Sequence, residues 1–537
     1  MTSTSKYRED WKLRHVGSTL FLGGTLMLSI IMGQALIVLA APVLLALYHW
    51  AIAPAVKFRH IAGPPFRPLV GNLPELFKNE YHEAVYQWSL QYGPVYRFFM
   101  GPTPIVVLAD PELSKNVGLT LFHDFHDRTA MQSIETAPDG LVFSKGAYWA
   151  GARSAVMPLF HTEQLEAYAP AMHGALSKMR ARMTEAAAKG EPVEVKQLTQ
   201  QLSFDIIGKA AFGVDFEAQT DAETGPLVVA ANKLINTIKI GSGAPLETVV
   251  GLFFPRAVQD CIAGLMKLVP GTMERVGFEN RKFLMDVAER TAAERRARGG
   301  EDDVMRSSDF LTYLARTARV KDTGRKLTDR EIRAIAMEVL LAGSDTTATT
   351  IAMAVFFLSY HADARNKVYK EIDRNAKAGV KEPGYSDLAK YSYVEQVVKE
   401  TLRMFSTGPL LIRTAKRDMH VAGTHIPAGT IVWLATETVH RNPVHFPDPE
   451  QFRPERFDPH NPEALQRHPY AYLPFGLGPR MCVGFKFAME EAQIALITLY
   501  QSFRFEPRPD TPTWPLKVWA GIVLKPSENI LLDVYLR

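Results

Sequence analysis

One loop near the C-terminus organises the whole sequence: Phe475-Gly476-Leu477-Gly478-Pro479-Arg480-Met481-Cys482-Val483-Gly484. It places a cysteine between glycines, two residues after an arginine and just ahead of helix formers at 486–500. The N-terminus of a helix favours negative charge, so we expect the Cys482 thiol to have a lowered pKa and to act as a soft metal ligand. Gly478 and Gly484 would allow a tight turn and the approach of a flat, bulky group. A lone cysteine is more often inert and buried, but the rest of this loop argues against that interpretation.

Composition describes an ordinary globular protein. The 537 residues are 47% hydrophobic and 22% charged, which is enough to bury a large core. A net charge of +4 is too small to indicate nucleic acid binding; a membrane surface or an acidic partner protein fits better. The two cysteines, Cys261 and Cys482, exclude a disulfide framework and a zinc ribbon and suit a reducing, cytosol-facing compartment.

The N-terminal segment predicts a membrane anchor. No Asp, Glu, Lys or Arg occurs between Arg14 and Lys57, and a spanning helix needs about 20 apolar residues. We therefore expect a polar segment at 1–15, an anchor at 16–56, a proline-rich hinge at 57–70 and a catalytic domain at 71–537. Gly33-Gln34 and Pro42 interrupt the anchor, so a single tilted helix and a re-entrant hairpin both stay open. Similar basic flanks leave its orientation undecided.

A second motif lies in a predicted long helix. Thr328-Asp329-Arg330-Glu331 has the pattern of a capping box, and the helix is expected to run to about Tyr360. Its middle reads Ala342-Gly343-Ser344-Asp345-Thr346-Thr347. Small residues there leave a groove, and a threonine can bond the carbonyl four residues back and distort the helix locally. Asp345 and Thr346 are costly in an apolar helix unless they have partners or a task.

These two motifs resemble those of the cytochrome P-450 family. The loop fits F-x-x-G-x-R-x-C-x-G at every fixed position, and the helix fits the family's oxygen-activation sextet. The resemblance implies a mainly α fold with a small β region, and heme b (iron protoporphyrin IX) held by Cys482. It implies that Asp345 and Thr346 deliver protons to dioxygen. The residues it implies around the cofactor are Arg480, Phe475, Gly478, Gly484 and Gly343.

Further family motifs occur in the expected order. Trp149 and Arg153, spaced i,i+4, would share a helical face and reach one heme propionate. Arg413 is a further candidate propionate partner. Glu400 and Arg403 lie one helical turn apart and are either a surface ion pair or, by resemblance, part of a buried network with an arginine of Phe452-Arg453-Pro454-Glu455-Arg456-Phe457. The motif alignment favours Arg456, with Arg453 as the alternative.

The remaining segments give simpler expectations. Residues 95–99 and 105–108 read as a strand hairpin, and Gln164–Ala188 and Lys196–Ala211 read as helices. The apolar stretch at 246–273 is either a core helix pair or a lid that dips into the membrane. His123 and His126 lack further ligands at fitting positions and are taken as ordinary polar residues, not a metal site.

The function implied is a monooxygenase that inserts one oxygen atom from O2 into a lipophilic small molecule. A heme-thiolate isomerase or dehydratase, and a non-catalytic heme carrier or sensor, are the alternatives. Only 55 residues follow Cys482, too few for a reductase domain, so electrons should come from a separate NADPH-cytochrome P-450 reductase. It should dock on the cysteine side, at Arg480 and Lys486.

The resemblance also implies a place in the cell and a subgroup. We expect a single-pass anchor in the endoplasmic reticulum membrane, contact with membrane lipid and a cytosolic catalytic domain. Residues 205–216 and 467–472 look like the group that contains plant carlactone oxidases and thromboxane synthase. Neither feature identifies a substrate.

Overall fold

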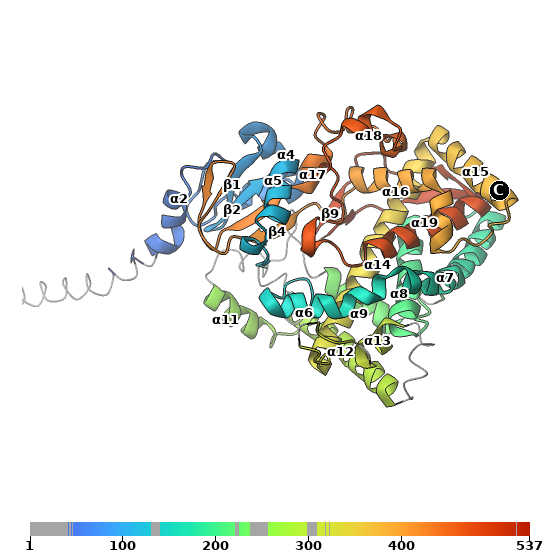
Figure 1. Cartoon of the computed structure of the whole chain (residues 1–537), viewed down its shortest axis with the longest axis horizontal. Helices are drawn as coiled ribbons and strands as arrows, with labels where there is room; N and C mark the ends of the chain where they lie inside the picture. Colours follow the sequence, from blue (N-terminus) through green and yellow to red (C-terminus); the bar gives the residue numbers. More distant parts are fainter. Residues whose placement is uncertain are drawn as a thin grey trace, which may run out of the picture.

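The computed structural model describes residues 41, 44–45, 47–129, 140–220, 225–236, 256–297, 309–316, 318–321, 323–521 and 523–537. Sheets built on β1, β2 and β4 lie to one side of a larger helical region (Figure 1). This agrees with the predicted mainly α fold with a small β region. The predicted anchor lies largely outside the described residues, so its structure is not part of this description.

The helices and strands occupy the following ranges. The α-helices are α2 Ala53–Lys57, α3 Leu73–Lys78, α4 Tyr81–Tyr92, α5 Pro111–Lys115, α6 Gly146–Val156, α7 Thr162–Lys189, α8 Val195–Ile207, α9 Pro226–Asn236, α11 Arg256–Met266, α12 Met273–Ala297, α13 Phe310–Arg316, α14 Asp329–Tyr360, α15 Ala362–Lys377, α16 Ser392–Met404, α17 Thr436–His440, α18 Pro462–Gln466 and α19 Phe485–Ser502. The strands are β1 Val95–Met100, β2 Thr103–Leu108, β3 Val193–Glu194, β4 Leu411–Thr414, β5 Met419–Val421, β6 Thr424–Ile426, β7 Ile431–Leu434, β8 Phe503–Pro507, β9 Val518–Ala520, β10 Leu524–Pro526 and β11 Leu531–Leu536. Short π or 3-10 turns are η1 Asn116–Thr120, η2 Phe122–Asp124, η4 Met157–Phe160, η5 Gly208–Phe212, η7 Tyr385–Lys390, η8 Pro454–Phe457 and η9 Gly478–Arg480.

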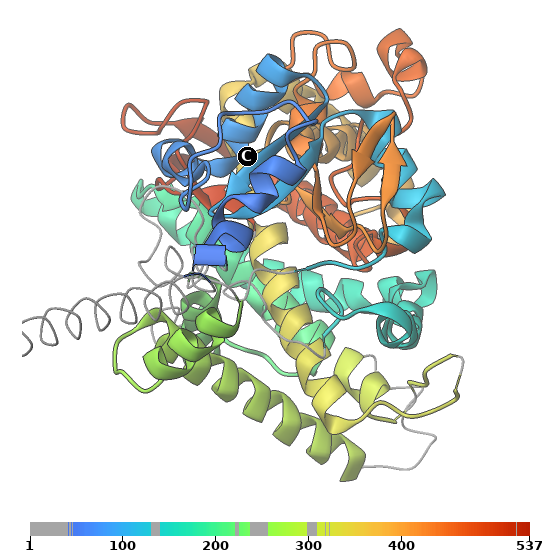
Figure 2. The same ribbon diagram turned by 90° about the vertical axis from the view of Figure 1, so that its left-hand side faces the viewer.

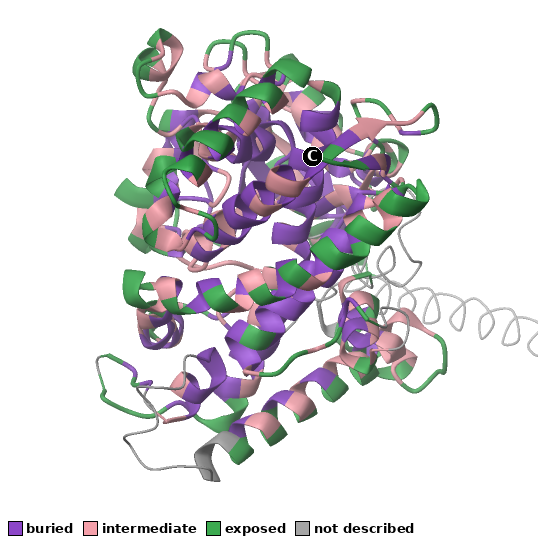
Figure 3. Ribbon diagram, turned by 90° about the vertical axis from the view of Figure 1, so that its right-hand side faces the viewer, coloured by how far each residue is buried: buried purple, intermediate pink, exposed green. Residues whose placement is uncertain are grey.

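Helix α14 is the centre of the helical region. The predicted capping box is present: the Thr328 hydroxyl accepts from the Glu331 N–H at 3.3 Å, and the Glu331 carboxylate accepts from the Thr328 N–H at 2.7 Å. At about 1.5 Å per residue, its 32 residues span much of the domain, and it packs against α8, α12 and α19. Figures 2 and 3 show it crossing the molecule, with most of its ribbon buried.

Among the described helices, α14 is also the one long and apolar enough to cross a bilayer. However, 72% of its most apolar window is buried inside the protein. The hydrophobicity of α14 therefore reflects a core helix, and this helix bears no relation to the N-terminal segment predicted as the anchor.

The main sheet has the strand order β1-β2-β7-β4. The predicted hairpin is confirmed, with β1 and β2 antiparallel and the turn made at Gly101, where φ is +58°. β7 pairs parallel with β2 and antiparallel with β4, which places Arg413 opposite Val432. A parallel neighbour requires a long connection, so the sheet brings residues from 95–108 and 411–434 together.

The helices predicted at 164–188 and 196–211 are α7 and α8, the latter ending in the η5 turn. The proline-rich residues 62–67 form no helix or strand, as expected of a hinge. In the apolar stretch at 246–273, residues 246–255 lie outside the description. The described part carries Leu265 and Leu268 at 60% and 74% exposure, so it is not the core helix pair that was one of the two expectations.

Candidate active site

The cysteine loop has the tight turn that its sequence predicted. Gly478 has φ +67°, and a side chain there would come within 2.2 Å of the Gly118 carbonyl oxygen. The Cys482 N–H donates to the Phe475 carbonyl at 2.9 Å, which closes the loop. Gly484 is the N-cap of α19 and has an ordinary φ of −92°, where a side chain would meet only the Phe160 ring at 3.4 Å. Glycine is therefore required by backbone conformation at position 478 but not at 484.

The electrostatics of Cys482 differ from the expectation. Its side chain is solvent-accessible, yet protein surrounds it closely enough for desolvation to raise the pKa of the thiol. A hydrogen bond from the Gly484 N–H and the charges of Arg153 and Arg128 act in the opposite direction without reversing the shift. The predicted lowering of this pKa is therefore wrong for the protein alone. A bound metal ion, which deprotonates a coordinating thiol outright, would supply what the helix N-terminus does not.

Four arginines gather around this loop, and we call them the arginine cluster: Arg128, Arg153, Arg413 and Arg480. Arg480 is 3% exposed, lies 3.9 Å over the Trp149 ring and donates to the carbonyls of Ser144 and His126 at 2.6 and 2.9 Å. Desolvation and the neighbouring Arg128 lower its pKa to about 9. Because Arg480 is buried, it cannot form part of a docking surface for a reductase, and that prediction is wrong.

Arg413 is the least satisfied member of the cluster. It is fully buried on β4 and donates to the Ile412 carbonyl at 2.9 Å, while Nε and Nη2 have no hydrogen-bond partner in the described part of the chain. Burial, then Arg128 and Arg480, lower its pKa well below the usual value. Orphaned buried donors of this kind are rare in proteins and normally mark a ligand or ion.

Helix α6 carries Trp149 and Arg153 on one face, as the i,i+4 spacing predicted. Trp149 is 7% exposed. Desolvation lowers the pKa of Arg153, and the Cys482 thiol acts against that shift. Arg153 and Cys482 therefore interact electrostatically although they are far apart in the chain.

Arg128 was not identified from the sequence. It donates to the Arg480 carbonyl at 2.9 Å and the Val142 carbonyl at 3.4 Å, and desolvation with Arg153 lowers its pKa to about 10. No motif surrounds it, so only the tertiary structure brings it to the site.

The cluster fits the two carboxylates of heme. Among the ion pairs of the described residues, its one carboxylate contact is that of Arg480 with Asp127, at 3.8 Å. The arginines of the cluster carry charges of one sign and lower each other's pKa, so a bound anion would stabilise them. Carboxylates are the anions that suit guanidinium groups best. A group that carries two carboxylates on one edge would bind the arginine cluster, and a metal ion in the same group would bind Cys482. No group of three or more His, Cys, Asp or Glu that could hold a metal occurs in the described part of the chain, His123 and His126 included.

The oxygen-activation sextet lies on α14 as predicted. The Thr346 hydroxyl donates to the Ala342 carbonyl at 2.7 Å, and the helix continues without interruption through this bond. Asp345 is 5% exposed; its Oδ1 accepts from Gln200 at 3.3 Å, and the Lys525 ammonium lies 3.5 Å from Oδ2. Desolvation lowers the pKa of Lys525, while Asp345 acts against that shift. The acid therefore has a buried cation beside it.

Gly343 faces away from this group. A side chain there would come within 2.9 Å of Ile207 Cδ1 on α8. The structure therefore explains this glycine by the close packing of α14 against α8, whereas the sequence placed it beside the cofactor.

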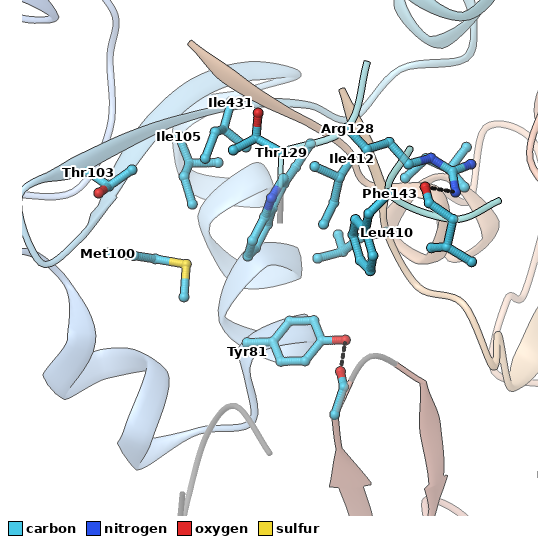
Figure 4. A pocket seen from close by; sticks show the side chains of 14 residues that line it. Tyr81, Met100, Thr103, Ile105, Arg128, Thr129, Phe143, Leu410, Ile412 and Ile431 are labelled. Carbon is cyan, nitrogen blue, oxygen red and sulfur yellow. Dashed lines mark hydrogen bonds between the residues drawn. The ribbon is translucent and has the colours of Figure 1, made fainter. Parts of the chain in front are cut away.

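Small cavities connect the two motifs. A cavity of about 20 Å³ is lined by both Thr346 and Phe475, so α14 and the cysteine loop face each other. A second, of about 140 Å³, lies along α14 from Glu338 to Thr346. A third, of about 160 Å³, reaches from Arg128 across apolar side chains to Tyr81 (Figure 4). The last two share Val142 and Phe143 and adjoin there.

Glu400 belongs to a fully buried network and not to the surface pair of the alternative interpretation. Arg403 donates to it at 2.7 and 2.9 Å, and Arg456 Nε donates to it at 3.2 Å. All three are at most 1% exposed. Arg453 contributes only its backbone N–H to Glu400, at 2.9 Å, while its side chain pairs with Glu463. The choice of Arg456 over Arg453 is confirmed.

Comparison with known proteins agrees with this geometry. The sequence profile of the family described as Cytochrome P450 matches residues 61–532. Cytochrome P450 3A6 of Oryctolagus cuniculus is 29% identical over 508 residues, covering 93% of this chain and 96% of the relative. Cytochrome P450 3A25 of Mus musculus is 30% identical over 491 residues, covering 89% and 91%.

These relatives correct the predicted subgroup, because they are 3A proteins and not plant carlactone oxidases or thromboxane synthase. The motifs, the arginine cluster and the length of the match agree on the broader assignment. The chain belongs to the cytochrome P450 family, whose members bind heme through a cysteine thiolate and act as monooxygenases.

Proposed function

We propose that this protein inserts one oxygen atom from O2 into a lipophilic small molecule, with Cys482 as the axial ligand of its heme. Heme, when bound, supplies the reduction and activation of dioxygen. The observation that carries the proposal is the arginine cluster, in which Arg413 and Arg480 are buried, beside an accessible thiol, because it offers cations to an anionic cofactor and one sulfur to its metal. Arg413, Arg480, Arg128 and Arg153 would hold the propionates, and Trp149 would support Arg480.

Asp345 and Thr346 are proposed to move protons at the active site. Lys525 lies beside the Asp345 carboxylate and donates to Asn236 at 2.8 Å. A proton can pass from the ammonium to the carboxylate and from there toward the Thr346 side of α14. Thr346 holds its own proton on the Ala342 carbonyl, which fixes the direction of its hydroxyl.

The adjoining cavities support a lipophilic substrate. Their walls are mostly apolar, with Phe143 and Val142 between them, and apolar side chains there exclude water from the reacting groups. We propose that electrons come from a separate NADPH-cytochrome P-450 reductase. Of the two residues predicted to form the docking surface, Arg480 is buried. The half-buried Lys486 is the one kept in this proposal.

We also propose that residues 16–56 anchor the protein in the endoplasmic reticulum membrane. The uncharged run from 15 to 56 and the exposed apolar side chains Leu44 and Leu45, at 64% and 57%, support this. A chain lacking residues 1–56 should be extracted from membranes by alkaline carbonate, whereas the full chain should remain in the pellet.

The ligand assignment is tested by carbon-monoxide spectroscopy of the reduced protein. Cys482→Ala should abolish the Soret band typical of thiolate-bound heme, whereas Cys261→Ala, which changes the other, exposed cysteine, should retain it. Retention of that band in Cys482→Ala would remove Cys482 as the ligand.

The reaction is tested with reductase, NADPH and a panel of lipophilic compounds. A monooxygenase should consume NADPH in step with an oxygenated product that takes up label from 18O2. Turnover of a peroxide without NADPH or O2 would instead indicate the isomerase or dehydratase. Bound heme with neither product nor added NADPH consumption in any assay would favour the carrier or sensor.

A further inference from the structure

Glu338 is a buried carboxylate whose role the oxygen-activation motif does not explain. It is 5% exposed and lies on α14, seven residues before Asp345 and eight before Thr346. Residues seven apart share a helical face, and all three line the same cavity of about 140 Å³. At about 1.5 Å per residue, Glu338 lies roughly 12 Å from Thr346 along the helix axis.

One oxygen of this carboxylate is satisfied and the other is not. Oε2 accepts hydrogen bonds from the backbone N–H groups of Leu141 and Val142, at 3.1 Å in the second case. Oε1 is buried and has no hydrogen-bond partner among the described residues. A side chain at Gly140 would overlap the carboxylate, so the segment at 140–142 wraps closely around it. Glu338 is therefore fixed in place, and its Oε1 can still accept a hydrogen bond.

The rest of the cavity offers little competition for a polar ligand group. Thr346 donates to Ala342, and Asp345 Oδ1 accepts from Gln200. Asp345 Oδ2 also lacks a hydrogen-bond partner among the described residues, but the Lys525 ammonium lies 3.5 Å from it and balances its charge, whereas Glu338 Oε1 has no cation in an ion pair with it. Of the remaining lining, Phe143, Leu234, Leu341 and Trp519 are apolar or aromatic. An unpartnered acceptor in an apolar pocket discriminates strongly for ligands that supply the missing donor.

We propose that Glu338 is a substrate-recognition residue, and that the preferred substrates are lipophilic molecules with one hydrogen-bond donor, a protonated amine or a hydroxyl, which binds Oε1. This rests on the proposed function, since it assigns the α14 cavity to the substrate. The donor bound at Glu338 holds the other end of the molecule about two helical turns away, toward Thr346. Glu338 is thus a positioning group for the site of oxidation.

Burial raises the pKa of Glu338 to about 7, while the Leu141 and Val142 N–H groups and the charge of Arg128 oppose the shift. Asp345 is the other carboxylate in the cavity. A cationic amine requires ionised Glu338, so its affinity should rise between pH 6 and pH 8 as the carboxyl loses its proton. A hydroxyl donor should show a weaker dependence.

The test uses the heme-loaded full chain and three probes with one skeleton: N,N-dimethyl-4-phenylbutylamine, 4-phenylbutan-1-ol and butylbenzene. Their binding is measured by equilibrium dialysis, which depends on neither turnover nor a heme spectrum. We expect the wild type to bind the amine at least tenfold more tightly than butylbenzene, with the alcohol between them. In Glu338→Gln the preference for the amine should fall at least tenfold and lose its pH dependence, while butylbenzene binding should change less than twofold.

Two further variants keep the result interpretable. Glu490→Gln changes another buried carboxylate, on α19, and should leave all three affinities unchanged. Glu338→Asp keeps the charge but withdraws it by one methylene, and should weaken amine binding at least threefold if Glu338→Gln does not fold. Equal donor preference in wild type and both Glu338 variants would overturn the proposal, as would a wild type without preference. Failure of NADPH-dependent oxygenation would instead count against the proposed function, because dialysis does not require it.

Discussion

Two groups of arginines, each with fully or nearly fully buried members, carry the same charge and have opposite surroundings. Around Glu400, Arg403 and Arg456 share one carboxylate and neighbouring carbonyls, and every member is bonded. In the arginine cluster, Arg413 has two donors without a partner among the described residues, and the one carboxylate in that part of the chain that pairs with Arg480 is 3.8 Å away. The first arrangement is satisfied by its own described side chains, whereas the second has donors to offer to a bound anion. Buried arginine therefore indicates architecture in one place and a cofactor site in the other.

The largest loss of stability should follow from removing Glu400, the carboxylate of the buried network. Glu400→Ala leaves Arg403 without an ion-pair partner among the described residues and leaves Arg456 with Glu463 alone, at 3.3 Å. Breaking a buried pair in this way costs about 3–5 kcal/mol. Denaturant unfolding should show a loss of that size, with little heme-loaded protein recovered. Glu395→Ala on the same helix removes an exposed pair with Lys399 and should cost about 0–1 kcal/mol. Similar losses of unfolding free energy in Glu400→Ala and Glu395→Ala would contradict the distinction between the buried network and the exposed pair.

Arg413→Leu should have a different outcome, because it removes a buried cation that forms no ion pair with the described residues and has two donors without a partner there. We expect soluble protein in normal yield but at least tenfold faster transfer of heme to apomyoglobin. The matched variant Arg417→Leu changes an exposed arginine that pairs with Asp124 and should transfer heme at the wild-type rate. If Arg413→Leu destabilises the fold and keeps its heme, Arg413 stabilises the fold and does not bind the cofactor.

Glu490 extends the comparison to an acidic side chain that is buried without hydrogen-bond partners among the described residues. It is fully buried, both carboxylate oxygens lack partners, and desolvation followed by Glu166 and Glu491 raises its pKa to about 9. The folded state therefore keeps a proton that the unfolded state releases between pH 4.5 and 9, so stability falls as pH rises through that range. Glu490→Gln should raise Tm at pH 8 and leave it nearly unchanged at pH 5. An equal change at both pH values would show that titration of Glu490 is not the cause.

The smallest effect is expected at Arg453. Its side chain is about one-third exposed and pairs with Glu463, and the N–H that reaches Glu400 belongs to the backbone. Arg453→Ala should therefore cost about 0–1 kcal/mol in thermal or denaturant unfolding. A loss as large as that of Arg456→Ala would show that the Arg453 side chain is part of the buried network.

Local patterns predicted the elements well. The capping box at Thr328 and the spacing of Trp149 and Arg153 each appeared as predicted, because they depend on neighbours within a helical turn. The motif alignment also selected Arg456 correctly. Glu338 could have been recognised as an acidic residue within the apolar part of α14, seven residues before Asp345 and therefore on the same face. Arg128 could not, since no local pattern marks it and its contact with the Arg480 carbonyl spans 352 residues.

The errors share one cause, which is that burial cannot be read from one segment. Arg480 was expected at a docking surface but is covered by Trp149 and bonded to the carbonyls of His126 and Ser144. The thiol of Cys482 was expected to have a lowered pKa, but desolvation outweighs the nearby N–H and cations.

The sequence alone determined the chemistry available to this protein: one cysteine in a glycine loop, an acid and an alcohol in one helix, and the order in which they occur. Short-range geometry carries that information, because turns and helices place neighbours by fixed dihedral angles. Only the tertiary structure decided which charges are paired and which carboxylate has an oxygen to spare. Those properties depend on desolvation and on contacts between distant segments, which no local pattern encodes.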